Sequence, residues 1–461
     1  MKSTEISPSQ LLTLENTDPI QMGFWVPNRI WASAKFMAPL RKHIEKKRAE
    51  GTLKDWVPVI AQFQTWLFNT TVFYPKTQSW QTYAYVLQEM IDQSNDFMAH
   101  QDQAIRDEIL EDGDTIFIPN MNYLLTALNE IITTSPSFNN TVMVGTPMNG
   151  LLAVSMATEA GLFLFHNEPF NQQLKLILNT WNAFLKSPDS LDKLDINDPE
   201  KPGSWISQAA WAAGVWDQMV HDPNLPGYGF DSWNSFFIRK FVPGARPFQG
   251  TSEVVDIGCE TTPWQYSDNL KYHTPYWIKD VDYSLIDIFG RQEEWASLFV
   301  GGQSYQGFLS ATHYHRWNSP IDGEIVRSWV QPGTYFAQRP FQGEDPGTWE
   351  GTESQPYLAN IAARAIFIFK HPQCGYIGLI CIGMVEVSTC VIDSPFLVDE
   401  GATPVAITKG EEIGHFEFGG STHMMIFQKD KVKLEEWAIH AVAHRNDKKP
   451  TKMGTVIARP V

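Results

Sequence analysis

The chain has 461 residues, of which 43% are hydrophobic and 13% aromatic, so it is long enough for two or three folded domains with substantial cores. Its formal net charge of -17 disfavours nucleic acids and anionic lipid surfaces as partners, because both present negative charge. A cationic or zwitterionic small molecule fits this charge better.

The N-terminal segment, MKSTEISPSQLLTLEN, has neither the basic start nor the apolar stretch of a signal peptide. No window of the chain reaches about 18 uninterrupted apolar residues, the length that indicates a membrane-spanning helix. We therefore expect a cytoplasmic protein without integral membrane association.

The first 200 residues have the periodicity of amphipathic helices, with apolar residues three or four positions apart and polar residues between them. This spacing predicts helices at Ile30 to Ala49, Asp55 to Thr70, Gln81 to His100, Met121 to Thr133, Met148 to Phe165 and Asn171 to Lys186. A further helix is predicted at Ser204 to His221. The polar stretch Ser187 to Ser204, which contains proline and aspartate, is typical of a linker and suggests a domain boundary near residue 200.

After Phe248 the sequence changes to short runs of β-branched and aromatic residues, separated by glycine and proline. Strands are predicted at Glu324 to Val330, Ala365 to Lys370, Tyr376 to Val385 and Met424 to Gln428, and the alternation His415 to Phe418 suggests one more. We expect an α+β protein, with a helical domain at 1–200 followed by a β-rich catalytic domain at 201–461.

The four cysteines, Cys259, Cys374, Cys381 and Cys390, include no Cys-x-x-Cys pair and no histidine at a spacing typical of zinc sites. The sequence therefore predicts neither a disulfide framework nor a metal site.

The segment Gly419 to Thr422, Gly-Gly-Ser-Thr, permits an unusual reaction. The hydroxyl of Ser421 can attack the carbonyl of Gly420 and convert the peptide into an ester; elimination then leaves dehydroalanine, which hydrolyses to a pyruvoyl group. Glycine at the attacked position tolerates the strained backbone that this attack needs. The same four residues are also common in a bulge or turn, so this interpretation needs support from elsewhere in the chain.

Four stretches supply that support. They are GYGFDSWNSFFIRKFVPGARP (227–247), GFLSATHYHRWNSPIDGEIV (307–326), PGTYFAQ (332–338) and KGEEIGHFEFGGS (409–421). Together these stretches resemble the phosphatidylserine decarboxylase family, and especially its soluble fungal branch that includes L-tryptophan decarboxylases of secondary metabolism. Their order and spacing match over about half the chain, and four motifs in order are stronger evidence than one.

The resemblance implies a self-processing carboxy-lyase whose pyruvoyl cofactor derives from Ser421, cut after Gly420 into a large and a small chain of one precursor. The pyruvoyl ketone would bind the amine of an amino acid, and the reaction then needs a proton donor and a base. His313 and His315 are candidates, because imidazole exchanges protons near neutral pH, and the resemblance favours His315. The structural alternative is two histidines alternating on a strand, one packed and one solvated.

The chain departs from the family at the base for self-cleavage. Asn318 stands where the family has a second histidine, and an amide takes up no proton at neutral pH. Glu260, next to Cys259, stands near the family's Asp-Gly and is expected to orient a histidine. Three outcomes stay open: His315 or His313 performs both tasks, His423 substitutes, or cleavage is slow or lost.

Two residues are expected to bind the substrate. The stretch IGMVEVSTC (382–390) is similar to the corresponding part of the tryptophan branch, so Glu386 is expected to contact the ammonium or the indole N–H. An exposed strand carboxylate is the alternative. Arg316 is expected to contact the substrate carboxylate or to form a structural ion pair.

These expectations together describe a decarboxylase that converts an aromatic L-amino acid, L-tryptophan first, into its amine and carbon dioxide. One alternative is a phosphatidylserine decarboxylase that makes phosphatidylethanolamine, against which the acidic charge and the missing anchor count. The other is an unprocessed, non-catalytic binding relative that keeps the fold.

Overall fold

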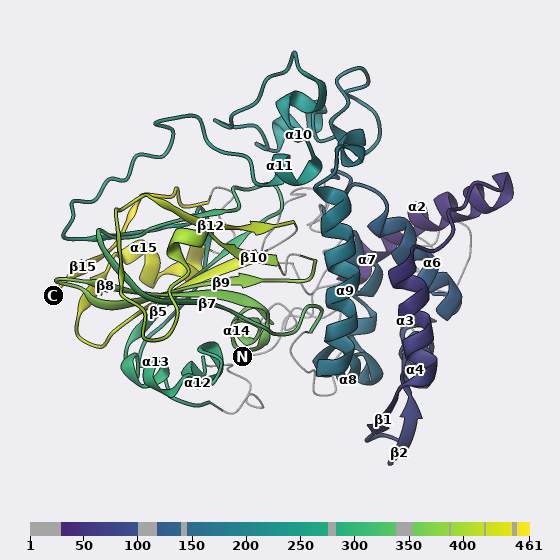
Figure 1. Cartoon of the computed structure of the whole chain (residues 1–461), viewed down its shortest axis with the longest axis horizontal. Coiled ribbons are helices and arrows are strands. Elements are labelled where there is room, and N and C mark those ends of the chain that lie inside the picture. Colours follow the sequence, from purple (N-terminus) through teal and green to yellow (C-terminus); the bar gives the residue numbers. More distant parts are fainter. Residues whose placement is uncertain are drawn as a thin grey trace.

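The protein has an α+β fold, with a helical first part beside a β-rich second part (Figure 1). The structure, a computed structural model, describes residues 29–99, 118–139, 145–274, 283–337, 354–386, 389–418, 421–444 and 450–461.

The helices of the first part pack against one another through apolar faces, and α9 is the long helix nearest to the strands (Figure 1). Side-chain caps begin several of them, as where Asn120 accepts a hydrogen bond from the Tyr123 N–H. The helices are α2 (Arg29–Glu50), α3 (Pro58–Asn69), α4 (Tyr83–Ala99), α6 (Met121–Ile132), α7 (Pro147–Leu152), α8 (Glu159–His166) and α9 (Glu168–Leu185). A hairpin of β1 (Thr71–Tyr74) and β2 (Ser79–Thr82), which the sequence analysis did not predict, joins α3 to α4.

Two long helices predicted from the sequence are wrong in part. The predicted helix 148–165 is split, because the 3₁₀ turn η2 (Ser155–Ala157) ends the first piece and the Thr158 hydroxyl caps α8 by accepting from the Gly161 N–H. The predicted helix 204–221 shortens to α10 (Gln208–Ala212), and the chain turns at Gly214, whose φ of 77° favours glycine. Caps and turns thus override apolar periodicity here.

Short elements connect the two parts. They are η3 (Pro188–Leu194), which lies in the predicted linker, α10, η4 (Pro226–Gly229) and α11 (Trp233–Phe237). Ser232 and Ser235 form a capping box at the start of α11, which fixes this short helix and the aromatic side chains that it carries.

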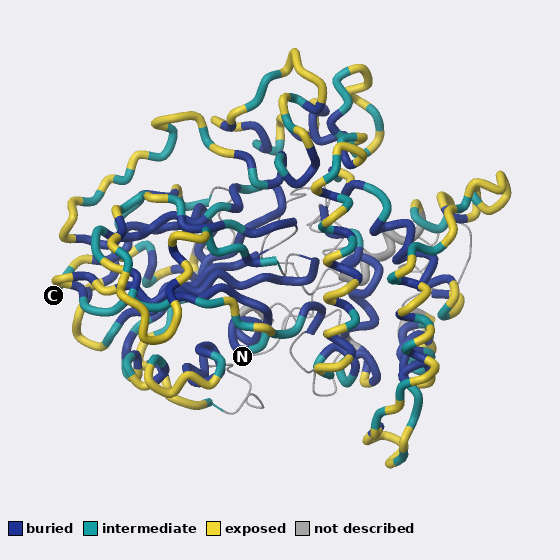
Figure 2. Tube along the Cα trace, in the orientation of Figure 1, coloured by how far each residue is buried: buried dark blue, intermediate teal, exposed yellow. Residues whose placement is uncertain are grey.

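An antiparallel seven-stranded sheet forms the centre of the second part. Its order is β11 (Val405–Ile407), β7 (Gly323–Gln331), β8 (Arg364–His371), β9 (Gly375–Gly383), β13 (Ser421–Phe427), β5 (Gln303–Leu309) and β4 (Thr262–Ser267). Figure 2 shows these strands mostly as buried chain. Side chains alternate along β13, so that Met424 joins the core with the helices while Met425 joins a second core on the other face.

Two three-stranded sheets accompany the central sheet. One has the order β10 (Thr389–Ile392), β12 (Glu412–Glu417) and β6 (Arg316–Asn318), and the other the order β14 (Val432–Leu434), β15 (Val456–Pro460) and β3 (Val255–Asp256). The short helices are α12 (Leu285–Ile288), α13 (Glu293–Leu298), α14 (Ser354–Ile361), α15 (Glu436–Ile439), η6 (Ser394–Phe396) and η7 (Ala441–His444). In the part of the chain that the structure describes, no helix has the length and apolar character needed to cross a bilayer.

Candidate active site

Ser421 is the first residue of β13, a strand flanked on both sides within the central sheet. It lies opposite Gly383 of β9 and Leu309 of β5. Its side chain is fully buried, and its Oγ has no hydrogen-bond partner among the described residues. A buried hydroxyl without a partner is rare and calls for an explanation.

The segment before Ser421 has an unusual backbone. Phe418 has a φ of 40°, which is costly for a residue with a side chain. The predicted cleavage position Gly420 lies outside the described residues, as does Gly419. Such outliers cluster at functional sites, and this one directly precedes the predicted break in the chain.

An aromatic cluster holds the ring of Phe418. Trp181 of α9 lies edge-on at 4.5 Å between ring centroids, Trp233 of α11 at 4.7 Å, and Phe237 of α11 at 5.8 Å. All four rings are buried. The helical part and α11 together therefore cover the chain on the N-terminal side of Ser421.

His315 touches this cluster. Its ring is fully buried and stacks on Phe237, with the centroids 4.0 Å apart, while its backbone carbonyl accepts from the Phe416 N–H at 2.8 Å. Phe237 thus contacts both His315 and Phe418. A single aromatic ring therefore lies between the predicted proton donor and the segment that leads to Ser421.

His313 is half-buried in the turn before β6, so neither histidine alternates on a strand as the structural alternative supposed. Its Nδ1 accepts from the Ser310 N–H at 3.2 Å. Burial, together with the neighbouring charge of Arg239, lowers the pKa of His313 to about 4, so this imidazole is neutral at pH 7. Arg239 itself is buried and donates to the carbonyl of Thr312 at 2.6 Å.

His423 lies two residues beyond Ser421, and its side chain is on the same face of β13. It is fully buried, and its ring meets that of Tyr305 edge-on at 5.9 Å. Burial lowers the pKa of His423 to about 3, although the backbone of Gly307 opposes this shift. His423 is therefore also a neutral imidazole at pH 7.

Glu260 is held by an arginine. Both of its carboxylate oxygens accept from Arg246, one of them from Nη2 at 2.7 Å, and the Met453 N–H approaches Oε2 at 3.4 Å. The expected role of Glu260 in orienting a histidine stays a prediction. Asn318, in β6, donates from Nδ2 to the carbonyl of Gly410 at 2.8 Å.

Arg316 forms an ion pair with Glu412 and donates from Nε to the carbonyl of Ile238 at 2.5 Å. This is the structural role that the sequence analysis left open. We therefore leave Arg316 out of the proposed substrate site.

Glu386 is only 4% exposed, so the alternative of an exposed strand carboxylate is wrong. It follows the end of β9, and its Oε1 accepts from the backbone N–H of Asn149 in α7 at 2.7 Å. Oε2 is buried and has no partner among the described residues. Burial raises the pKa of Glu386 to about 8, although backbone amides that include Met148 and Asn149 oppose the shift.

The sequence did not reveal which residues surround the predicted site residues: Phe418, Trp181, Trp233, Arg239 and Asn149. Tryptophan and phenylalanine at helical spacing indicate a core but do not show what that core covers. No group of three or more histidine, cysteine, aspartate or glutamate side chains within the described ranges could hold a metal ion.

Comparison with known proteins agrees with this architecture. Residues 233–459 match the family model for phosphatidylserine decarboxylase, and residues 58–213 match a second model named for the same enzyme. The chain is 35% identical to "Decarboxylase iboD" of Amanita muscaria over 308 residues, which are 61% of this chain and 84% of that protein. It is 32% identical to the L-tryptophan decarboxylase of Psilocybe cubensis over 333 residues, which are 68% and 73% of the two chains.

A more distant relative is the phosphatidylserine decarboxylase proenzyme of Pasteurella multocida, 28% identical over 51% of this chain and 77% of that protein. The match to the fungal relatives covers most of their length, and the bacterial and fungal relatives alike are named as decarboxylases. The chain therefore belongs to the phosphatidylserine decarboxylase family and is a carboxy-lyase.

Proposed function

We propose that this protein is a self-processing, pyruvoyl-dependent decarboxylase that converts an aromatic L-amino acid, L-tryptophan first, into its amine and carbon dioxide. The observation that carries the proposal is the buried hydroxyl of Ser421, which has no hydrogen-bond partner among the residues that the structure describes and follows the strained Phe418 and two glycines. Relatives named proenzymes and relatives named L-tryptophan decarboxylases support it. The mature enzyme would have a large chain ending at Gly420 and a small chain of residues 421–461.

The surroundings of residue 421 suit a pyruvoyl group. The position is buried, it lies between two paired strands, and Gly383 opposite has no side chain. The pyruvoyl ketone supplies an electron sink for the loss of carbon dioxide from an amino acid bound through its amine. The aromatic cluster around Phe418 excludes water from the N-terminal side of the site.

His315 is the proposed proton donor to the substrate carbon, and we assign it the base role in self-cleavage as well. The ring of His315 stacks on Phe237, which also contacts Phe418. Asn318, at the family's usual position of the base, instead donates to a backbone carbonyl. His313 and His423 are the alternative bases. Both are neutral at pH 7, but pKa values of about 4 and 3 make them weak bases at that pH, so they rank behind His315 in this proposal.

Glu386 is the proposed contact to the substrate side chain. We keep the division into a helical domain at 1–200 and a catalytic domain at 201–461 as part of the proposal. Glu386 of the second domain reaches Asn149 of the first, so the substrate site would draw on both.

The intact mass of the denatured protein tests the processing step. We expect two chains whose masses add up to nearly that of the uncut chain, because forming the pyruvoyl group only exchanges ammonia for water. The small chain should begin with a pyruvoyl group rather than with serine. Ser421→Ala should give one chain. Ser304→Ala is the matched control, because Ser304 is equally buried with an unpartnered Oγ on the adjacent strand β5, and this variant should still be cut.

The amine product tests the substrate. Purified enzyme should release tryptamine from L-tryptophan faster than phosphatidylethanolamine from phosphatidylserine vesicles. The reverse order would favour phosphatidylserine as the substrate, and a single uncut chain without any amine product would favour the non-catalytic binding relative.

A further inference from the structure

The position of Glu386 relative to Ser421 suits contact with the far end of a bound amino acid. Gly383 pairs directly with Ser421 in the sheet. Glu386 follows Gly383 by three residues, so its backbone lies within ~10 Å of Gly383. Under the proposed function, on which this inference rests, the amine of the substrate is bound at residue 421. Glu386 is then available for the side chain of the substrate and not for its amine.

The turn that carries Glu386 is strained. Val385 has a φ of 50°, a genuine outlier for a β-branched residue. Its N–H donates to the carbonyl of Tyr335 at 3.0 Å, and the Gly383 N–H donates to the carbonyl of Ala363 at 2.8 Å. Such a conformation persists only where its surroundings hold it, and here it directs the Glu386 carboxyl group toward α7.

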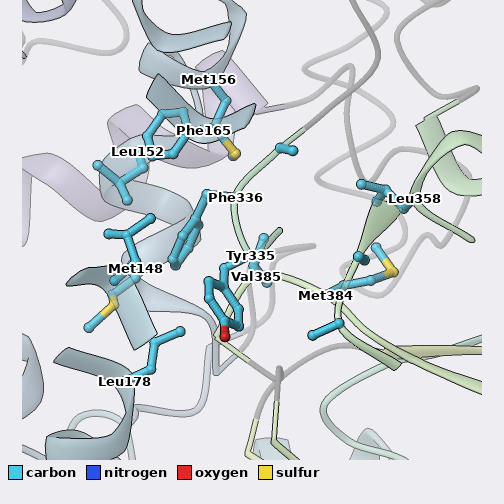
Figure 3. Packing of buried hydrophobic residues seen from close by; sticks show 14 of the residues in the cluster. Met148, Leu152, Met156, Phe165, Leu178, Tyr335, Phe336, Leu358, Met384 and Val385 are labelled. Carbon is cyan, nitrogen blue, oxygen red and sulfur yellow. The ribbon is translucent and has the colours of Figure 1, made fainter. Parts of the chain in front are cut away.

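The surroundings of this turn are apolar and come from both parts of the chain. Figure 3 shows Val385 and Tyr335 at the centre, with Met148 of α7 on one side and Met384 on the other. Phe336 packs beside Phe165 of α8, with ring centroids 6.1 Å apart. These residues belong to one buried cluster, so an aromatic side chain would find apolar neighbours beside the carboxyl group.

Within these surroundings the two carboxylate oxygens of Glu386 differ. Oε1 accepts from the Asn149 N–H, whereas Oε2 is buried without a partner among the described residues. A buried acceptor without a donor is costly unless a bound molecule supplies the donor. An aromatic ring with its own N–H group supplies one where a purely hydrocarbon ring does not.

We propose that Glu386, fixed by the first turn of α7, binds the substrate as a carboxylate and accepts a hydrogen bond from the ring N–H, a contact that itself favours the ionised form. The substrate class is therefore an L-amino acid with an N–H-bearing heteroaromatic ring. The helical part of the chain takes part in choosing this substrate, because it holds the other oxygen of the same carboxyl group.

The first test compares L-tryptophan with L-3-benzothienylalanine, in which sulfur replaces the ring N–H at nearly the same shape. We expect the native enzyme to favour tryptophan in kcat/KM by roughly tenfold to a hundredfold. Glu386→Gln should bring this ratio close to one. Its amide keeps one oxygen for the Asn149 N–H but places an NH₂ donor against the ring N–H.

The control variant is Glu417→Gln. Glu417 is also a buried carboxylate that contacts the helical part, but it does so through Asn182 of α9 and Lys186, which follows α9, and not through α7. This variant should keep the preference for tryptophan. Loss of the preference in both variants would mean that general loosening of the helical contact explains the effect, and the inference would be overturned.

The second test needs no cofactor. In the Ser421→Ala background, 3-methylindole should bind more tightly than 3-methylbenzothiophene, and Glu386→Gln should remove the difference, as measured by titration calorimetry. Equal binding of the two fragments would overturn the inference. A protein that binds 3-methylindole selectively but decarboxylates no aromatic amino acid would instead refute the proposed function and leave the ring contact standing.

Discussion

The two parts of the chain contribute differently to the region around Ser421. On the β side, backbone pairing with β5 and β9 sets the position of Ser421 on both edges of its strand. On the helical side, single side chains and one backbone N–H reach across, as Trp181 does to Phe418 and Asn149 to Glu386. The sheet thus positions Ser421, the proposed reacting residue, whereas the helices cover the chain before it and hold the residue proposed to contact the substrate side chain.

Among changes in the β-rich part, replacement of His315 should have the largest effect on the rate of decarboxylation. Because His315 is also the proposed base for self-cleavage, most of the His315→Asn protein should stay uncut. In the fraction that is cut, the rate of decarboxylation should fall about 10²- to 10⁴-fold, because general acid catalysis typically contributes this much. Single-turnover release of carbon dioxide measures the effect.

His313→Asn and His423→Asn are the matched variants. If either slows decarboxylation as much as His315→Asn does, the assignment of the proton donor to His315 is wrong. Whichever of the three variants stays uncut identifies the base for self-cleavage.

Loss of Trp181 tests the helical side. Trp181 is buried, packs on Phe418 and donates to the carbonyl of Thr134 at 3.0 Å, so Trp181→Ala should lower the free energy of unfolding by about 3–5 kcal/mol. Urea denaturation measures this change. Trp80→Ala is the control, because Trp80 is 70% exposed on the β1–β2 hairpin and its loss should change stability by about 0.5 kcal/mol or less. Equal losses in the two variants would contradict the proposed enclosure by α9.

Acid should weaken the contact between the two parts through Glu417. Burial acts to raise the pKa of this carboxyl group, but hydrogen bonds from His415, Lys186 and Asn182 outweigh it and hold the pKa at about 2. Since this pKa lies below the ordinary value, the stabilisation is present above about pH 4.5 and is lost as the pH falls toward 2. The loss amounts to at most about 3 kcal/mol.

Unfolding free energies measured between pH 6 and pH 3 test this effect. The native protein should lose more stability over this range than Glu417→Gln. Glu435→Gln is the control, because Glu435 forms a partly exposed ion pair with Arg459 and its removal should leave the acid sensitivity unchanged. An identical pH dependence of the native protein and Glu417→Gln would exclude Glu417 as the cause.

Several features of the fold could be predicted from the sequence because they depend on neighbours in the chain. Apolar periodicity predicted α3, α6 and α9 closely, and β-branched runs predicted β7, β8, β9 and most of β13. Periodicity failed where a local cap or a glycine turn interrupted it, as at Thr158 and Gly214.

The sequence also allowed the chemistry of the candidate site to be predicted, because Gly-Gly-Ser-Thr and the two histidines, taken with the four family-like stretches, suggest a mechanism. The sequence did not show which residues the charged side chains contact. Arg316 pairs with Glu412, 96 residues away in the chain, and Glu386 accepts a hydrogen bond from Asn149, 237 residues away.

The sequence by itself determined many of the elements, the family likeness and the candidate residue for the proposed cofactor, since these follow from local patterns and residue chemistry. Only the tertiary structure decided that Ser421 is buried without a hydrogen-bond partner in the described part of the chain, that Phe237 contacts both His315 and Phe418, and that a helix holds one oxygen of Glu386. The physical reason is that burial and hydrogen bonding depend on which surfaces meet when the chain folds, and residues hundreds of positions apart supply those surfaces.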